Sequence, residues 1–382
     1  MLNVMSDISI PNKDLFNEAR LKRLMKEEGL SAVIGFSPAN VTYLSGYHNI
    51  DMILLPELMH AAIYPLDGEP TLLLYDNMNP FQTFVNDVRR FQGSAEEDIA
   101  LSSLVEILRE KNFSGEKIGV EKRYMPAHNW EVLKREFPEV QWADSTDVME
   151  RTRNVKTPKE IEVLRAAARA TDEAIFMAYS NARPTDTEKS VGNAMSYNVM
   201  RLGADIVSFN ILASGQRITR GHFLGEDVLL EPGTLMRCDF GALFNGYFTD
   251  LARMAVVGKP SERQRETYAR FYEAHQRSLA AVRPGITGEG LFDASMKGYQ
   301  DLGLGPRGMV GHSIGLVIHE RPVLATGEPW EVEEGMVMCI ENGSIEEKYA
   351  ERYHIEDAIL VTKNGYEILS DYTDSTKMVV ID

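Results

Sequence analysis

Residues 238–250 read Cys-Asp-Phe-Gly-Ala-Leu-Phe-Asn-Gly-Tyr-Phe-Thr-Asp, which predicts two short strands joined by a tight turn at the Asn-Gly pair. A two-residue loop would place Asp250 opposite Gly241 and diagonal to Asp239, whereas a four-residue loop would place the two aspartates directly opposite each other. Both registers put the carboxylates on one face, because side chains alternate along a strand. Like charges on adjacent strands repel unless a positive group, typically a divalent metal ion, lies between them. The alternative is an acidic hairpin exposed to solvent.

Three further segments supply residues that such a metal site needs. His312 lies between glycines, Glu341 ends an apolar strand, and Glu356 lies within another apolar strand, where an unpaired acid is costly to bury. Taken singly, His312 could be an ordinary loop histidine, and either glutamate could face solvent on an edge strand. Taken with Asp239 and Asp250, they form a set of carboxylates with one imidazole, which suits two close divalent ions.

The composition narrows the expected partners. The chain has 382 residues, of which 44% are hydrophobic and 25% are charged, and this fits two globular domains of unequal size. Its formal net charge of -17 argues against nucleic acid and anionic membranes, because both polyanions would be repelled. We therefore expect a small molecule or a short peptide as the substrate.

The cysteines and the start of the chain indicate the compartment. Cys238 and Cys339 are too few for a disulfide framework, which points to a reducing environment, and we interpret both as small buried packing residues. Residues 1–14 lack a basic start followed by an apolar stretch, and no run approaches the length that crosses a bilayer. The expectation is a soluble cytoplasmic protein.

Two domains are expected, at residues 1–153 and 154–382. In the first, helical patterns alternate with short apolar strands, which predicts an α/β domain with its own core. None of the predicted metal ligands lies in it. The expected helices span about 17–28, 99–111 and 130–137, and the expected strands span about 32–36, 61–64, 72–75, 118–120 and 140–142.

The second domain begins with a strong helix signal. Thr157 is a suitable N-cap, Pro158 occupies the first helical position and Glu160 the third, so we expect a long helix that ends near Tyr179. The pattern then repeats in outline, because two helices followed by strands occur twice. Such a duplication would bring two sheets together around a central cleft, with the aspartates from the first half and His312 and the glutamates from the second. Binding sites favour such junctions.

The five predicted ligands, in this order, resemble the pattern of the pita-bread metallohydrolases, the family of methionine aminopeptidase, Xaa-Pro aminopeptidase, prolidase and creatinase. Residues 38–46 and 153–161 also resemble the amino-terminal domain and linker of the prolidase and creatinase branch. The resemblance covers nearly the whole chain. It implies an α/β amino-terminal domain followed by an α+β pita-bread catalytic domain with a pseudo-twofold duplication. The family pattern of D-x-G, a second aspartate eleven residues later, G-H-x-I-G and two strand glutamates is met by Asp239, Asp250, His312, Glu341 and Glu356.

The resemblance also implies a role for each ligand. Asp239 would chelate one metal, His312 and Glu341 would hold the other, and Asp250 and Glu356 would bridge the pair. The ions, which could be manganese, cobalt, zinc or iron, would lower the pKa of a shared water. The resulting hydroxide would attack the substrate carbonyl while Glu341 moves the proton.

Two more histidines fit catalytic positions of the family. His222 would contact the scissile nitrogen side, and His319 would contact the substrate carbonyl or the developing oxyanion. His312 and His319 are seven residues apart, so a regular strand would put them on opposite faces unless Gly315 breaks it. The alternative is that His222 and His319 are surface or core histidines.

Two positions depart from the peptidases of this branch. They usually carry proline after the first glutamate, where this chain has Asn342, and arginine two residues before the second, where it has His354. A histidine cannot give the bidentate, permanently charged contact that arginine gives to a carboxylate. Strict specificity for prolyl peptides is therefore in question.

The leading hypothesis is a dinuclear metal-dependent hydrolase of the Xaa-Pro dipeptidase or aminopeptidase type, which cleaves a small peptide or amide bond. One alternative keeps the fold but acts on a small nitrogenous osmolyte or zwitterion, as a creatinase-like or ectoine-hydrolase-like enzyme or as a lyase. Another is a catalytically silent binding protein, which the retention of all five ligands disfavours. The resemblance also implies a homodimer in which residues near Tyr47, His48 or His60 help the other chain to select its substrate.

Overall fold

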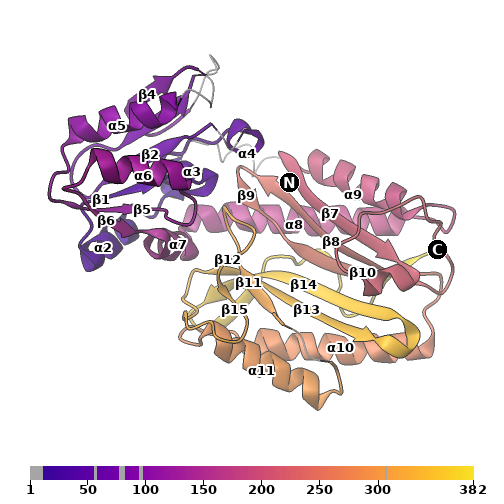
Figure 1. Cartoon of the computed structure of the whole chain (residues 1–382). Coiled ribbons are helices and arrows are strands. Elements are labelled where there is room, and N and C mark those ends of the chain that lie inside the picture. The colour runs from indigo at the N-terminus through magenta and orange to yellow at the C-terminus, as the bar shows by residue number, and fades with distance from the viewer. Residues whose placement is uncertain (1–11, 56–57, 77–81, 94–97, 306–307) are drawn as a thin grey trace. The chain divides into compact units, whose positions relative to one another are not determined.

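The computed structural model divides the chain into two compact units, Ile8–Arg153 and Asn154–Asp382 (Figure 1). The expectation about residues 1–14 falls mainly on residues outside the description. The residues that the structure describes are 12–55, 58–76, 82–93, 98–305 and 308–382.

The amino-terminal unit is a mixed sheet of six strands in the order β4-β3-β2-β1-β5-β6, with helices packed on it. Strand β1 pairs antiparallel with β2 and parallel with β5. This confirms the predicted α/β domain. The strands are β1 (Ala32–Gly35), β2 (Ala61–Pro65), β3 (Thr71–Tyr75), β4 (Asp87–Phe91), β5 (Lys117–Val120) and β6 (Gln141–Asp144), and the helices are α2 (Glu18–Glu28), α3 (Pro38–Ser45), α4 (Asp51–Leu54), α5 (Ile99–Lys111), α6 (Ala127–Glu136) and α7 (Thr146–Asn154).

Local signals account for several of these elements. Gly29 ends α2 with a left-handed φ of 64°, which glycine adopts without strain. Helix α5 buries an apolar stripe that includes Leu104 and Leu108 against Ile34 of the central strand. Strand β4 was not predicted, because its sequence Asp-Val-Arg-Arg-Phe is too polar to be recognised.

The carboxy-terminal unit begins with the predicted long helix, α8 (Pro158–Asn181). The Thr157 side chain accepts from the Glu160 backbone N–H, and Glu160 accepts from the Thr157 backbone N–H, so the capping box is complete. Helix α9 (Glu188–Arg201) starts in the same way from Thr187. The start of α8 is therefore where the sequence predicted it.

The strands of this unit form one sheet of ten strands, whose main path is β12-β11-β13-β14-β10-β8-β7. The expectation of two sheets was wrong, because Ala252 of β10 pairs with Glu356 of β14 and joins the two halves. The duplicated outline remains, since α8 and α9 pack along the first half and α10 (Glu262–Ala280) packs on β13 of the second. The strands are β7 (Ile206–Ser214), β8 (Leu235–Phe244), β9 (Tyr247–Phe248), β10 (Leu251–Val257), β11 (Gly311–Ser313), β12 (Glu320–Val323), β13 (Val337–Glu346), β14 (Glu351–Thr362), β15 (Gly365–Ile368) and β16 (Val379–Ile381).

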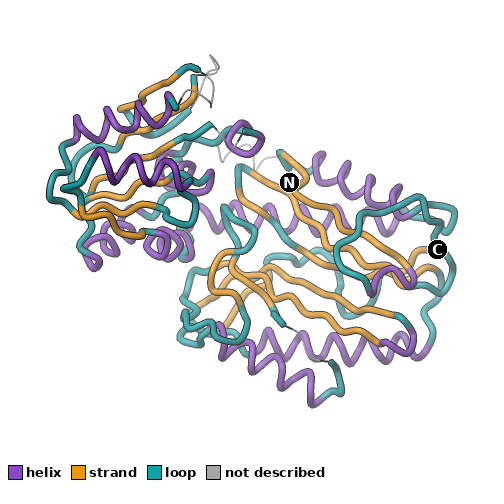
Figure 2. Tube along the Cα trace, in the orientation of Figure 1, coloured by secondary structure: helices purple, strands orange, loops and turns teal. Residues whose placement is uncertain are grey.

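The core of the second half lies between this sheet and helices α10 and α11 (Gly288–Asp301), which run along it in Figures 1 and 2. Phe271 and Tyr299 of the two helices are fully buried against Met338 and Ile355 of β13 and β14. Burying a large apolar side chain contributes about 1.5–3 kcal/mol. This packing fixes the two strands that carry the predicted glutamates.

Candidate metal centre

The hairpin that carries the two aspartates closes through a two-residue loop. Phe244 pairs with Tyr247 across the loop, and Asn245 and Gly246 have φ values of 52° and 80°, as a type I′ turn requires. Of the two predicted registers, the first is therefore the one that forms.

Gly241 allows the strands to approach closely at the acidic end. Ala252 pairs with Asp239, and the same register puts Asp250 opposite Gly241. A Cβ atom on Gly241 would lie 2.2 Å from the backbone oxygen of Thr249, well inside contact distance. The glycine of the D-x-G motif thus keeps the segment with Asp250 next to the strand with Asp239.

Glu356 and Glu341 join the aspartates from strands β14 and β13. Glu356 pairs with Ala252 on one side and with Glu341 on the other. Directly paired residues point to the same face of a sheet, so Glu341, Glu356 and Asp239 share one row across four strands. The carboxylate oxygens of Asp239, Asp250 and Glu356 lie within 4.8 Å of one another.

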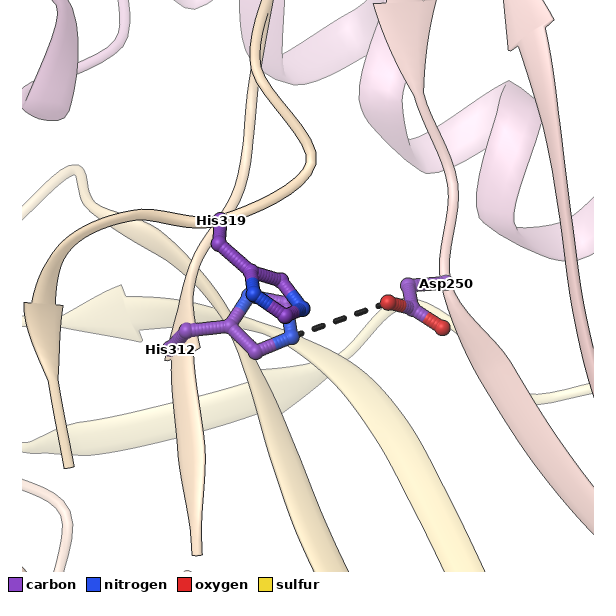
Figure 3. A group of neighbouring side chains, drawn as sticks. All are labelled: Asp250, His312 and His319. Atoms are coloured by element: carbon purple, nitrogen blue, oxygen red, sulfur yellow. Dashed lines mark ion pairs between the residues drawn. The ribbon is translucent and has the colours of Figure 1, made fainter. Parts of the chain in front are cut away.

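His312 points from β11 toward Asp250 of this cluster, as Figure 3 shows. Its Nε2 atom lies 3.6 Å from Oδ2 of Asp250 and 3.6 Å from Oε1 of Glu356. Its Nδ1 atom lies 3.0 Å from the carbonyl oxygen of Ser313, which can only accept. Nδ1 therefore carries the hydrogen, and Nε2 is the nitrogen that faces the carboxylates.

His319 reaches the same place because the strand ends between the two histidines. Strand β11 stops at Ser313, and the rings of His312 and His319 then lie with their centroids 4.1 Å apart (Figure 3). A ring nitrogen of His319 lies within 4.8 Å of the ligand atoms of His312 and Asp250. The break in the strand that the glycine allowed is confirmed.

The cluster carries more negative charge than its protein surroundings stabilise. Burial, and then the carboxylate of Asp250, raise the pKa of Asp239 and of Glu356 well above the usual range. Burial disfavours a charged His312, but Asp250 and Glu356 outweigh it and raise the pKa of His312. Oδ1 of Asp250 and Oε1 of Glu356 are buried, and no described residue donates a hydrogen bond to them. Such oxygens are costly to bury without a partner.

This donor set fits divalent cations. Carboxylate oxygens with one imidazole suit manganese, cobalt, iron or zinc, and cations between the carboxylates would relieve their repulsion. Cys339 also lies near His312 and Glu356, but burial and then the charge of Glu356 raise the pKa of its thiol well above the usual range. The other donors are carboxylates and one imidazole, whereas a thiolate suits softer metal sites, so Cys339 fits this set poorly.

His222 lies apart from the cluster, on an exposed loop after the short helix η3 (Gly215–Thr219). Among the described residues, the groups whose ligand atoms converge do not include it. Burial, then His312, and more weakly His222 lower the pKa of His319, so the two exposed histidines lie within electrostatic range of each other. His319 is thus beside the cluster, and His222 is farther out.

Sequence reasoning missed two buried cations near the site. Arg237, two residues before Asp239, is 1% exposed, and a charge inside the apolar strand could have signalled it. Lys156 is buried, with Nζ 3.3 Å from Ser313 Oγ and 3.3 Å from Glu320 Oε2. Lys156 therefore contacts the residues that directly follow His312 and His319. Its contact with Glu320 spans 164 positions, so no local sequence pattern could predict it.

Asn342, one of the two departures from the family pattern, belongs to a buried network. Its Nδ2 donates to Ser278 Oγ at 3.1 Å, and its Oδ1 accepts from His275 Nδ1 at 3.2 Å. His275 Nε2 donates to Asp357 at 2.8 Å, and Asp357 also pairs with the buried Arg253. A proline at 342 could make neither side-chain bond, so the asparagine is adapted to its neighbours here.

Comparison with known proteins identifies the family. Residues 162–363 match metallopeptidase family M24, which is more than half of the chain. The chain belongs to metallopeptidase family M24. Residues 19–155 match the creatinase/prolidase amino-terminal domain.

Several relatives of this M24 protein are similar over nearly their whole length. The Xaa-Pro dipeptidase of Pyrococcus furiosus is 29% identical over 365 residues, which cover 92% of this chain and 96% of that protein. The prolidase structure from Pyrococcus horikoshii OT3 has a TM-score of 0.78 at 26% identity and covers 94% of this chain and 98% of that one. The X-Pro aminopeptidase structure from Thermotoga maritima MSB8, at 23% identity, has a TM-score of 0.82, covers 96% and 100%, and supports the fold alone.

Membership of family M24 settles the class of reaction. The protein is a metal-dependent hydrolase of the peptidase type, with a creatinase-like amino-terminal domain and a pita-bread domain, as predicted. The comparisons do not favour an osmolyte-directed enzyme or a lyase on this fold, and they disfavour a silent binding protein. Of the helices in the described part of the chain, none combines the length and apolar character that a membrane crossing requires.

Proposed function

We propose that this M24 peptidase hydrolyses the bond before proline in short peptides, as an Xaa-Pro dipeptidase or aminopeptidase. We further propose that two divalent ions, of manganese, cobalt, zinc or iron, are held by the predicted ligands. Asp239 would chelate one ion, His312 and Glu341 the other, and Asp250 and Glu356 would bridge them. The relatives named Xaa-Pro dipeptidase and prolidase support the substrate class.

One observation carries the metal assignment. Asp239, Asp250 and Glu356 bring buried carboxylates together within 4.8 Å, and His312 turns its Nε2 atom toward two of them. No described residue donates a hydrogen bond to Oδ1 of Asp250 or to Oε1 of Glu356. Other buried carboxylates, such as those of Asp172 and Asp357, are paired with Arg253. Buried acids that converge at one point and lack hydrogen-bond donors have the form of a cation site.

The residues around the cluster can bind, orient and move protons. When bound, the ions supply Lewis acidity, which makes a water nucleophilic near neutral pH and polarises a carbonyl. Glu341 can take and return a proton, because it lies at the edge of the row of carboxylates and is partly exposed. His319, exposed and with a lowered pKa, is neutral near pH 7 and can donate one hydrogen bond to the substrate carbonyl. His222, farther out, would contact the nitrogen side of the scissile bond.

The remaining assignments rest on the resemblance to this family. We propose domains at residues 1–153 and 154–382, a homodimer, and a cytoplasmic location. Both cysteines are buried free thiols, which fits a reducing compartment. Analytical ultracentrifugation would test the dimer, and a monomer at micromolar concentration would contradict it.

A substrate panel tests the proposed function. The purified protein is loaded with each candidate metal and assayed with Xaa-Pro dipeptides, longer Xaa-Pro peptides, matched Xaa-Ala dipeptides, creatine and ectoine. We expect hydrolysis of the prolyl substrates, with loss of activity on chelation. Turnover of creatine or ectoine with no peptide cleavage would contradict the proposal.

A further inference from the structure

Arg237 occupies an unusual position for a buried arginine. Its Nη1 atom lies 3.1 Å from Nδ1 of His354, and its Nη2 atom donates to the backbone oxygen of Gly221 at 3.4 Å. Its Nε atom is buried, and no described residue accepts its hydrogen. An unsatisfied buried donor destabilises the folded state, because its hydrogen bonds to water are lost and not replaced. Arg237 is therefore kept at a cost in stability, which favours a role in the site.

The hydrogen-bond directions through His354 follow from the chemistry of its partners. Arginine has donors and no acceptor, so Nδ1 of His354 must accept from Arg237. Nε2 then carries the hydrogen and donates to Oε1 of Glu341, 2.9 Å away. Arg237 therefore donates to His354, and His354 donates to Glu341. Both ring nitrogens of His354 are used, so His354 is not free to bind metal, although it lies close to Glu341 and Glu356.

The location of Arg237 explains the departure at His354. Asp239 and Glu356 share one row of the sheet, because both pair with Ala252. Arg237 lies two residues before Asp239, and His354 lies two residues before Glu356. Side chains two residues apart share a face, so Arg237 and His354 lie in the next row on the same face. The arginine that related peptidases usually carry in β14 is thus replaced here by a guanidinium from β8. The charge still acts on the cluster, because Arg237 opposes the raised pKa of Asp239.

We propose that Arg237 is a positioning residue that orients Glu341 through His354 and, through the Gly221 carbonyl, fixes the loop that carries His222. This inference rests on the proposed metal ligation by Glu341. It predicts that a group at 354 must offer one acceptor and one donor, a requirement that glutamine meets and leucine does not. It also predicts that an arginine introduced at position 354 on β14 can take over the role of Arg237 when Arg237 on β8 is substituted.

The test measures manganese affinity by titration calorimetry, together with kcat and KM on a prolyl dipeptide, for a set of variants. Arg237→Met should weaken the affinity for one of the two ions by about 10–100-fold and lower kcat more than it raises KM. Arg237→Met/His354→Arg should recover most of both losses. His354→Gln should stay within a few-fold of the wild type, and His354→Leu should resemble Arg237→Met.

Arg263→Met is the matched control, because Arg263 makes two hydrogen bonds of 2.7 Å to Glu351 on the same strand as His354. It should leave manganese affinity unchanged. The proposal is overturned if Arg237→Met keeps both ions at full affinity, if the double variant recovers nothing, or if His354→Leu equals His354→Gln. Should Arg237→Met not fold, the comparison of the two His354 variants decides. A wild type without prolyl activity would refute the proposed function, while the affinities still test the role of Arg237.

Discussion

Glu160 provides a quantitative test of how burial changes the pKa of a carboxylate in the carboxy-terminal unit. It is 1% exposed at the start of α8, where Oε2 accepts from the Thr157 backbone at 2.7 Å and Oε1 accepts from the Tyr247 hydroxyl at 3.1 Å. Burial raises its pKa from 4.5 to about 7, against the opposing effects of Thr157 and Lys156. The perturbation is Glu160→Gln, which keeps the size and removes the titration.

The sign of the effect follows from the direction of the shift. Between pH 4.5 and about 7 the folded state holds a proton on Glu160 that the unfolded state has lost, so stability falls as the pH rises through this interval. A shift from 4.5 to about 7, at 1.36 kcal/mol per unit, corresponds to about 3 kcal/mol. Glutamine escapes this loss. The free energy of unfolding of Glu160→Gln, relative to that of the wild type, should therefore rise by about 3 kcal/mol between pH 4 and pH 8.

The assay is urea unfolding of the full-length protein at both pH values, monitored by circular dichroism. Other titrating groups are the same in both proteins and cancel in the difference. Glu162→Gln is the control, because Glu162 lies on the same helix with its side chain 57% exposed. A constant difference between Glu160→Gln and the wild type at the two pH values would refute the reasoning.

Three further predictions concern the site. Gly311→Ala should cost several kcal/mol of stability and weaken metal binding, because its φ is 147° and a Cβ would lie 2.2 Å from the Cys339 carbonyl oxygen. Thermal unfolding measures the cost, and a shift in Tm no larger than that of Gly305→Ala, which has open space around it, would contradict it. Asn342→Ala should lower the free energy of unfolding by about 1–3 kcal/mol, since Ser278 and His275 lose their partner, and a change under 0.5 kcal/mol in urea unfolding would argue against the network. Chelation should lower Tm more at pH 8 than at pH 5, because the raised pKa values of Asp239 and Glu356 leave the metal-free cluster less repulsive when protonated; equal shifts in calorimetry would contradict this.

Much of the fold was predictable where the signal is local. The Asn245-Gly246 pair predicted the hairpin, and its two-residue loop then fixed the register of Asp239 and Asp250. Thr157 and Glu160 predicted the start of α8. In each case neighbouring residues determine the local geometry, although the sequence left a two-residue and a four-residue loop open and the structure decides for the first.

The remainder depends on strands that meet across long sequence separations. The single pair of Ala252 with Glu356 makes one sheet of what looked like two, and no local pattern specifies it. The contact of Arg237 with His354 spans 117 positions for the same reason. The sequence showed only that His354 replaces the arginine usual in this branch. Its contact with Arg237 on β8 is what indicates its role.

The number of divalent ions per chain tests the central claim most directly. The protein is equilibrated with manganese, dialysed, and analysed for metal content, with Asp250→Ala and Glu356→Ala beside an Asp227→Ala control whose carboxylate is 77% exposed. We predict two ions in the wild type and in the control, and loss of bound metal in both cluster variants while circular dichroism shows a folded protein. Two ions retained by either cluster variant, or none bound by the wild type, would contradict the account.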